Sequence, residues 1–175
     1  MRNSILINII FFLYLVKNVS AENINIQSKN IILDKNKETS IFQNEVVIKT
    51  KNESTIKSDY AEYNKLSGLI KLKGNIEATD VQQNKIETKI AEYNEKEKIF
   101  KSIGPTKITT TENYIIEGED IFFDNIKNFI LSEKSAVITD QEKNKIYLES
   151  FKYLTKTNIF KSIGYIKIED IKNNS

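Results

Sequence analysis

The stretch Ile56 to Asp80, "IKSDYAEYNKLSGLIKLKGNIEATD", contains two alternating segments on either side of a polar turn. Ala61 and Tyr63 stand two residues apart in the first segment. In the second segment, apolar residues and a glycine alternate with polar and charged residues: Ile70, Leu72, Gly74, Ile76 and Ala78 against Lys71, Lys73, Asn75 and Glu77. A period of two places one set on a buried face and the other in water. The stretch therefore predicts a strand, a turn and a longer strand.

The same scheme returns every 30 residues without insertions. The blocks begin at Ile26, Ile56, Ile86, Ile116 and Ile146, and their seventh following residues are Leu33, Tyr63, Tyr93, Phe123 and Tyr153. The tetrapeptide "KSIG" occupies one position in two blocks, at 101–104 and 161–164. Repeated strand pairs bury their apolar faces only by stacking on each other. We therefore expect an all-β protein, an elongated β-roll or jelly-roll built from five 30-residue strand-turn-strand repeats.

Glycines at a shared offset predict bends within the strands. Gly74, Gly104 and Gly164 lie in the middle of the second strand of their blocks, where glycine usually marks a bulge or a sharp bend. Asn44 and Lys134 take this position in the first and fourth blocks, so we expect those copies to turn differently or less.

The segment "IETKIAEYNEKEKIFKSI", residues 86–103, has the spacing of an amphipathic helix when it is taken alone. Its counterparts in later blocks carry aromatic and β-branched residues, which favour strands. Since equivalent repeats share one structure, we expect strands here as well.

The short strand around Asp59, Ala61 and Tyr63, followed by a turn and by "GNIEA" at 74–78, resembles the OstA-like periplasmic lipopolysaccharide-transport family, represented by LptA and the N-terminal domain of LptD. "IAEYNEKEKIFKSIGPTKIT" is a looser second copy, and the resemblance extends over roughly Ile26 to Ile168. It implies a V-shaped β-jelly-roll whose apolar interior holds the acyl chains of lipopolysaccharide. It also implies that successive jelly-rolls join head to tail into a bridge across the periplasm.

The predicted inward residues are candidates for such a groove, although a closed core explains them equally well. Small residues on the same face, such as Ala61, Ala91 and Ser102, leave room for a ligand but also suit the packing of two sheets. The candidate groove residues are Ile70, Leu72, Ile76, Phe100, Ile108, Phe123, Ile130, Ile138 and Phe160.

Composition excludes several classes of chemistry. The 175 residues include no cysteine and no histidine, which removes disulfides, thiolate or imidazole metal sites and histidine-based acid–base catalysis. Paired carboxylates such as Glu117 and Glu119 could serve a glycosidase. With 24 acidic residues in the chain, we interpret such pairs as chance neighbours on solvated strands. We expect no enzyme activity, no cofactor and no metal.

The first 21 residues differ from the rest and predict a cleaved secretory signal. Arg2 precedes an apolar run from Ile5 to Val16, and Val19-Ser20-Ala21 supplies small residues for cleavage. These twelve residues, interrupted by Asn8, fall short of the roughly 20 that span a bilayer, so an anchored, LptC-like protein is the less favoured alternative. Residues 22–175 would form the OstA-like domain in the periplasm. Loss of Arg2 and Lys17 leaves 24 basic residues against 24 acidic ones, which argues against nucleic acid as a partner.

The expected partners are lipopolysaccharide and other jelly-roll proteins of the transport system, LptC-like and LptD-like. Unpaired strand edges, around Phe42 to Ile48 in the first block and Tyr165 to Ile168 in the last, would join such proteins and could also form head-to-tail homo-oligomers. Two alternatives remain open. The chain could be the periplasmic docking domain of an outer-membrane LptD-like assembly protein, or a secreted β-solenoid that binds carbohydrate.

The signal assignment predicts that the exported protein begins at Glu22. N-terminal sequencing of protein released from the periplasm should read Glu-Asn-Ile-Asn. Recovery of intact residues 1–16 in the inner membrane would instead identify an anchored protein.

Overall fold

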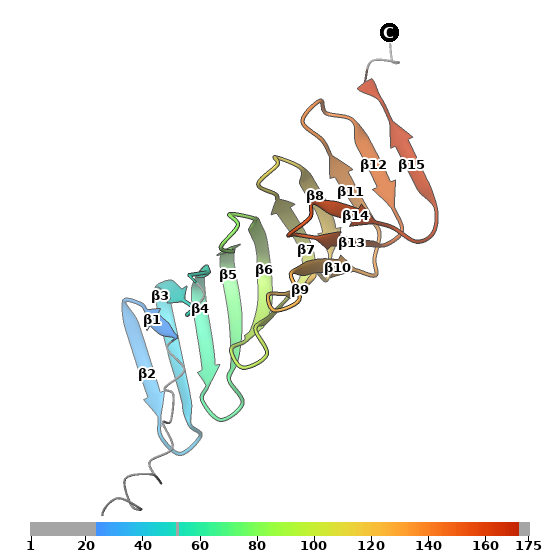
Figure 1. Ribbon diagram of the computed structural model, residues 1–175. Coiled ribbons are helices and arrows are strands. Elements are labelled where there is room, and N and C mark those ends of the chain that lie inside the picture. The colour runs from blue at the N-terminus through green and yellow to red at the C-terminus, as the bar shows by residue number, and fades with distance from the viewer. Residues whose placement is uncertain (1–23, 52, 172–175) are drawn as a thin grey trace, which may run out of the picture.

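The computed structural model describes residues 24–51 and 53–171, so the predicted signal, residues 1–21, lies outside the described part of the chain. The described residues form one 15-stranded sheet in which the strands pair antiparallel, and this confirms the all-β prediction (Figure 1). Among these residues, no helix is long and apolar enough to cross a membrane. The strands are β1 (Asn25–Gln27), β2 (Asn30–Asp34), β3 (Thr39–Lys49), β4 (Thr55–Asn64), β5 (Leu69–Thr79), β6 (Lys85–Asn94), β7 (Ile99–Thr109), β8 (Ile115–Glu119), β9 (Phe122–Asp124), β10 (Phe129–Ser132), β11 (Ala136–Thr139), β12 (Lys145–Leu148), β13 (Phe151–Leu154), β14 (Ile159–Lys161) and β15 (Ile166–Glu169).

The sheet is divided lengthwise into two halves by a line of bends. Strands β3 to β7 are each 10 or 11 residues long and pass through both halves. Half-sheet A contains β1, β8, β11, β12, β15 and the segments 46–49, 55–58, 76–79, 85–88 and 105–109. Half-sheet B contains β2, β9, β10, β13, β14 and the segments 39–43, 60–64, 69–73, 90–94 and 99–103.

In the long strands the bends are bulges in the strand ladders, and two of them lie at predicted glycines, Gly74 and Gly104. The register shifts between Lys73 and Ile76 on β5, and Gly74 there has a φ of 96°. Gly104 and Gly164 have φ values of 80° and 106°. These backbone conformations are ones that residues with a Cβ rarely adopt. The predicted bends within strands are therefore confirmed at Gly74 and Gly104, whereas at Gly164 the chain leaves the ladder between β14, which ends at Lys161, and β15, which begins at Ile166.

The first and fourth blocks turn differently, also as predicted. In β3, Asn44 and Glu45 both take positive φ values, 64° and 54°, and the register shifts beside them. Near Lys134 the chain leaves the ladder altogether, because β10 ends at Ser132 and β11 begins at Ala136. The expectation of one short and one long strand per block is wrong. The early strands are nearly equal in length, since both arms of each block run through the bend.

Two rows of turns close the strand pairs, one along each free edge of the folded sheet. We call the turns 50–54, 80–84, 110–114 and 140–144 lip A, and the turns 35–38, 65–68, 95–98, 125–128 and 155–158 lip B. The last residue of each lip-B turn has a positive φ, and the repeat spaces these residues by 30: Glu38, Gly68, Lys98, Asn128 and Asn158. The 30-residue repeat read from the sequence is therefore present in the backbone.

The core lies between the half-sheets, which fold toward each other about the bends. Apolar side chains from both halves form one continuous cluster, including Ile48, Ile70 and Ile108 with no exposed area. Each such side chain stabilises the fold by about 1.5–3 kcal/mol. The outward Lys71 and Lys73 are exposed, as the alternation predicts.

The edges of the sheet differ from the prediction at the N-terminal end. Residues 42–48 belong to β3, and this strand is covered by β2 beside half-sheet B and by β1 beside half-sheet A. The first edge is therefore β1 and β2, because residues 25–34 form strands of their own. At the other end, β14 and β15 form the edge, and β15 contains Ile166 to Ile168 of the predicted segment, Tyr165 to Ile168.

The bend at Gly74 depends on space that a Cβ atom would fill. An added Cβ would clash with the side chain of Asp59, whereas at Gly104 it would meet nothing within 4 Å. We expect Gly104→Ala to lower the free energy of unfolding by about 1–2 kcal/mol through backbone strain alone, and Gly74→Ala by about 1 kcal/mol more. Urea denaturation measures both values.

A double-mutant cycle tests the cause of that difference. Asp59→Gly removes the clashing side chain, so the double variant Asp59→Gly/Gly74→Ala should lose about 1 kcal/mol less than the sum of the single losses. Additive losses, or equal losses at the two glycines, would contradict this account of the bend.

Candidate functional site

The predicted groove residues lie on the two facing walls of the interior. Eight of the nine are buried, and Phe160 is partly buried against the same cluster. Half-sheet A contributes Ile76, Ile108 and Ile138, and half-sheet B contributes Ile70, Leu72, Phe100, Phe123, Ile130 and Phe160. The structure thus brings all nine to one interior.

This interior is filled by side chains. A cavity of about 20 Å³ remains near the lips, lined by Thr50, Ser54, Phe100, Phe123 and Ile130 among others. That volume is about enough for one water molecule. The hydroxyls of Thr50 and Ser54 are buried and have no hydrogen-bond partner among the described residues. A ligand larger than water therefore requires the half-sheets to move apart.

Side chains join the two lips near the C-terminal end. The Asn158 side-chain amide in lip B donates a hydrogen bond of 3.1 Å to a carboxylate oxygen of Glu112 in lip A, and accepts one of 2.8 Å from the Tyr153 hydroxyl. Phe160 stacks on Tyr153 with ring centroids 4.3 Å apart. Its ring also meets the edge of Tyr114 at 5.8 Å. We call the opening between lip A and lip B the mouth. Together these contacts hold its C-terminal part shut.

The tyrosines at the mouth offer no base for catalysis. Burial raises the pKa of Tyr93 to about 12, and the nearby Glu95 carboxylate acts in the same direction. Burial also raises the pKa of Tyr153, with smaller contributions from the charges of Glu112 and Asp80. Both phenols therefore stay protonated at neutral pH and act as packing groups and hydrogen-bond donors.

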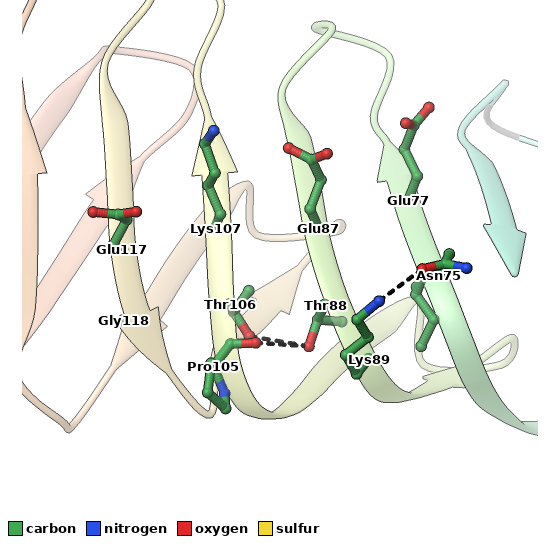
Figure 2. Close-up of a pocket in the computed structure, with 11 residues that line it drawn as sticks. Asn75, Glu77, Glu87, Thr88, Lys89, Pro105, Thr106, Lys107, Glu117 and Gly118 are labelled. Atoms are coloured by element: carbon green, nitrogen blue, oxygen red, sulfur yellow. Dashed lines mark hydrogen bonds between the residues drawn. The ribbon is translucent and has the colours of Figure 1, made fainter.

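A hollow of about 490 Å³ lies on half-sheet A beside the bends, lined partly by charged side chains (Figure 2). Glu77 pairs with Lys85 at 2.7 Å and with Lys57 at 3.3 Å, and these partners lower the pKa of its carboxyl group. Glu117, one member of the carboxylate pair considered from the sequence, also lines the hollow. Among the described residues no group of acidic side chains gathers in a way that could hold a metal ion.

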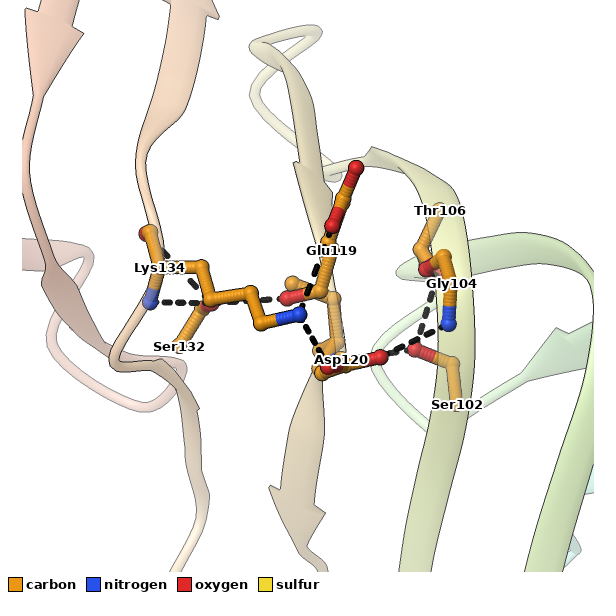
Figure 3. Close-up of polar contacts among 8 residues, drawn as sticks. Ser102, Gly104, Thr106, Glu119, Asp120, Ser132 and Lys134 are labelled. Atoms are coloured by element: carbon orange, nitrogen blue, oxygen red, sulfur yellow. Dashed lines mark hydrogen bonds and ion pairs between the residues drawn. The ribbon is translucent and has the colours of Figure 1, made fainter.

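The other member of that pair, Glu119, belongs to a polar network at the break between β8 and β9 (Figure 3). Lys134 pairs with Asp120 at 2.6 Å and with Glu119 at 3.4 Å. The Gly104 N–H donates to Asp120 at 2.7 Å, and the Ile121 N–H donates to the Ser102 hydroxyl at 2.9 Å. These contacts satisfy backbone groups that the broken ladder leaves unpaired, so the network has a structural role.

One outward apolar surface was not expected from the sequence. A hollow of about 910 Å³ beside β7 and β10 includes Ile103, Phe122, Phe129 and Leu131 in its lining. The rings of Phe122 and Phe129 stack with centroids 5.9 Å apart. Successive side chains of a strand point to opposite faces, so the place of Phe122 next to the inward Phe123 could have revealed its outward position.

Comparison with known proteins gives one family. The family model described as "Lipopolysaccharide-assembly, LptC-related" matches residues 18–130. No curated protein matches the chain. Two solved structures are similar in part. LptH of Pseudomonas aeruginosa, described as the LptA homologous periplasmic component of the lipopolysaccharide transport device, is 12% identical over 85% of this chain and 95% of that chain, with a TM-score of 0.33. The TCP10 domain of Danio rerio CPAP, in complex with a STIL peptide, is 8% identical over 86% of this chain and 95% of that chain, with a TM-score of 0.18.

Because both TM-scores are low, the family assignment rests on the family model and not on the solved structures. It confirms the resemblance to lipopolysaccharide-transport proteins that the repeats suggest, and it agrees with a transport component rather than an enzyme. Since the matched region covers more than half of the sequence and includes β1 to β9, the chain belongs to the lipopolysaccharide-assembly, LptC-related family.

Proposed function

We propose that the protein carries lipopolysaccharide in the periplasm, with the acyl chains held between half-sheets A and B. The mature protein would comprise residues 22–175. The observation that carries this proposal is the connection between the half-sheets. Within the described residues, they are joined through the bends and by side chains at the lips, but no backbone hydrogen bond joins lip A to lip B.

Hydrogen bonds instead connect neighbouring turns within each lip. In lip B, the Glu95 N–H donates to the Gly68 carbonyl at 2.9 Å, and the Thr155 N–H donates to the Asn128 carbonyl at 3.1 Å. In lip A, the Asn84 side-chain oxygen accepts from the Thr111 N–H at 3.1 Å. The half-sheets can therefore part at the mouth while each remains intact. Acyl chains that enter would replace apolar contacts that the opening removes.

The proposal predicts which side chains meet lipid. A photoreactive residue in place of Ile76, Ile108 or Phe123 should crosslink to purified lipopolysaccharide, because these positions face the interior. The same residue in place of the outward Lys71 or Lys73 should not. Gel mobility and mass spectrometry identify the adducts. Equal labelling at both sets of positions, or none at any, would refute an internal lipid site.

Locking the mouth provides a control for this experiment. Glu112→Cys/Asn158→Cys places two thiols where the lips touch, in a chain with no other cysteine. Joining them with a short bis-maleimide should suppress the interior crosslinks, and the unjoined double variant should retain them.

We further propose that the protein forms part of a bridge by adding strands at its two edges. At the N-terminal edge, Ile31 and Leu33 are exposed although they lie on the inward face beside Phe42 and Ser40. At the C-terminal edge, Ile166 and Ile168 are exposed although they pair with Leu148 and Ile146. Both ends of the core are thus uncovered. LptC-like or LptD-like jelly-rolls, or a second copy of this chain, would cover them by strand addition.

Charge at the C-terminal end should prevent self-association. We expect the wild type to form head-to-tail chains whose mass rises with concentration, and Ile166→Asp/Ile168→Asp to remain monomeric because two buried carboxylates would lack partners. Light scattering after size-exclusion chromatography measures the mass. The control Ile90→Asp/Ile103→Asp changes two exposed isoleucines on the outer face and should associate like the wild type. A wild type that is monomeric at every concentration would exclude the homo-oligomer.

A further inference from the structure

The two lips of the mouth carry opposite charge, although the mature chain would be formally neutral. The five turns of lip B contain seven lysines and three glutamates. The four turns of lip A contain two lysines and five acidic residues. The basic residues of lip B are Lys35, Lys37, Lys65, Lys96, Lys98, Lys127 and Lys156, and the acidic residues of lip A are Glu53, Asp80, Glu112, Asp140 and Glu142.

Five of the seven lysines of lip B form no ion pair with an acidic side chain among the described residues. Lys37 pairs with Asp34 at 3.7 Å, and Lys127 pairs with Asp124 at 3.5 Å. The two aspartates end β2 and β9, the strands that precede these turns. The Lys96 ammonium donates to the Leu66 carbonyl, an uncharged acceptor, at 2.7 Å. The exposed Lys35, Lys65 and Lys156 make no ion pair with any described residue.

The three glutamates of lip B offset part of this charge and leave lysines in excess. Glu95 is buried and accepts a hydrogen bond of 2.8 Å from the Tyr63 hydroxyl. Glu38 and Glu97 remain exposed. Within the described residues, no ion pair connects lip B to the acidic lip A. The lysines of lip B therefore do not hold the two lips together.

The repeat arranges the lysines as a row along the opening. Every lip-B turn supplies at least one lysine, and successive turns are two strands apart, which spaces them by about 10 Å. The row runs directly beside the interior, because Asn158 of lip B touches Glu112 of lip A and Phe160 of the adjoining β14 packs against the core.

We propose that lip B binds the anionic headgroup of an amphiphile whose chains lie between the half-sheets. This rests on the proposed function, since it requires the interior to accept the chains. Ammonium groups attract an anionic headgroup through charge and donate hydrogen bonds to its oxygens. The carboxylates of lip A repel the same headgroup. A bound amphiphile therefore leans toward lip B, and this fixes which way its headgroup points as it passes along the roll.

The test compares two amphiphiles that share one chain, dodecyl phosphate and dodecyl maltoside, below their micelle concentrations. Isothermal calorimetry on the mature protein measures their affinities. We expect Lys35→Gln/Lys65→Gln/Lys156→Gln to weaken dodecyl phosphate binding by about tenfold and to change dodecyl maltoside binding by less than about twofold. The wild-type affinity for the phosphate should also fall with salt more steeply than that of the variant.

A matched variant controls for net charge. Lys71→Gln/Lys107→Gln/Lys161→Gln removes three exposed lysines that lie on the outer faces and form no ion pair with a described residue. It should bind both amphiphiles like the wild type. Equal weakening by the two triple variants, or no weakening by the lip-B variant, would overturn the headgroup site while leaving the interior carrier intact. A wild type that binds neither amphiphile would overturn both proposals.

Discussion

The bend inside each long strand is the constraint on which the rest of the structure depends. A single strand such as β5 has to supply one segment to each half-sheet, and its ladder therefore shifts register between Lys73 and Ile76. The positive φ of Gly74 makes that shift possible. Without aligned bends, the apolar faces of the two halves would belong to one flat sheet, and neither would be covered. Aligned bends turn a repeated hairpin into an enclosed interior.

Much of this architecture could be predicted from the sequence, because the repeat supplies several independent readings of each position. Residues 86–103 would pass for a helix alone, but their counterparts indicate strands, and β6 and β7 confirm them. The offset of Gly74, Gly104 and Gly164 located the bends for the same reason. The inward positions of the candidate residues followed from period-two alternation, which a bulge preserves on either side.

What the sequence did not reveal depends on contacts between blocks rather than within them. The N-terminal edge was placed on residues 42–48, since nothing in residues 25–34 says that they cover β3. The charge of the lips was hidden in a neutral total, because composition counts charges without locating them. Phe122 and Phe129 stack on each other because β9 and β10 pair, which the chain order alone does not establish.

The identical length of the blocks has a consequence for how such a protein can change size. The left-handed residues that close the lip-B turns recur every 30 residues from Glu38 to Asn158, with neither gain nor loss between blocks. Duplication or deletion of a whole block would keep every bend and turn in phase and would lengthen or shorten the body by about 10 Å, the width of two strands. A change of any other size would put one bend out of line with its neighbours. The reach of the molecule is thus set in discrete steps, and the number of blocks acts as its measure of length.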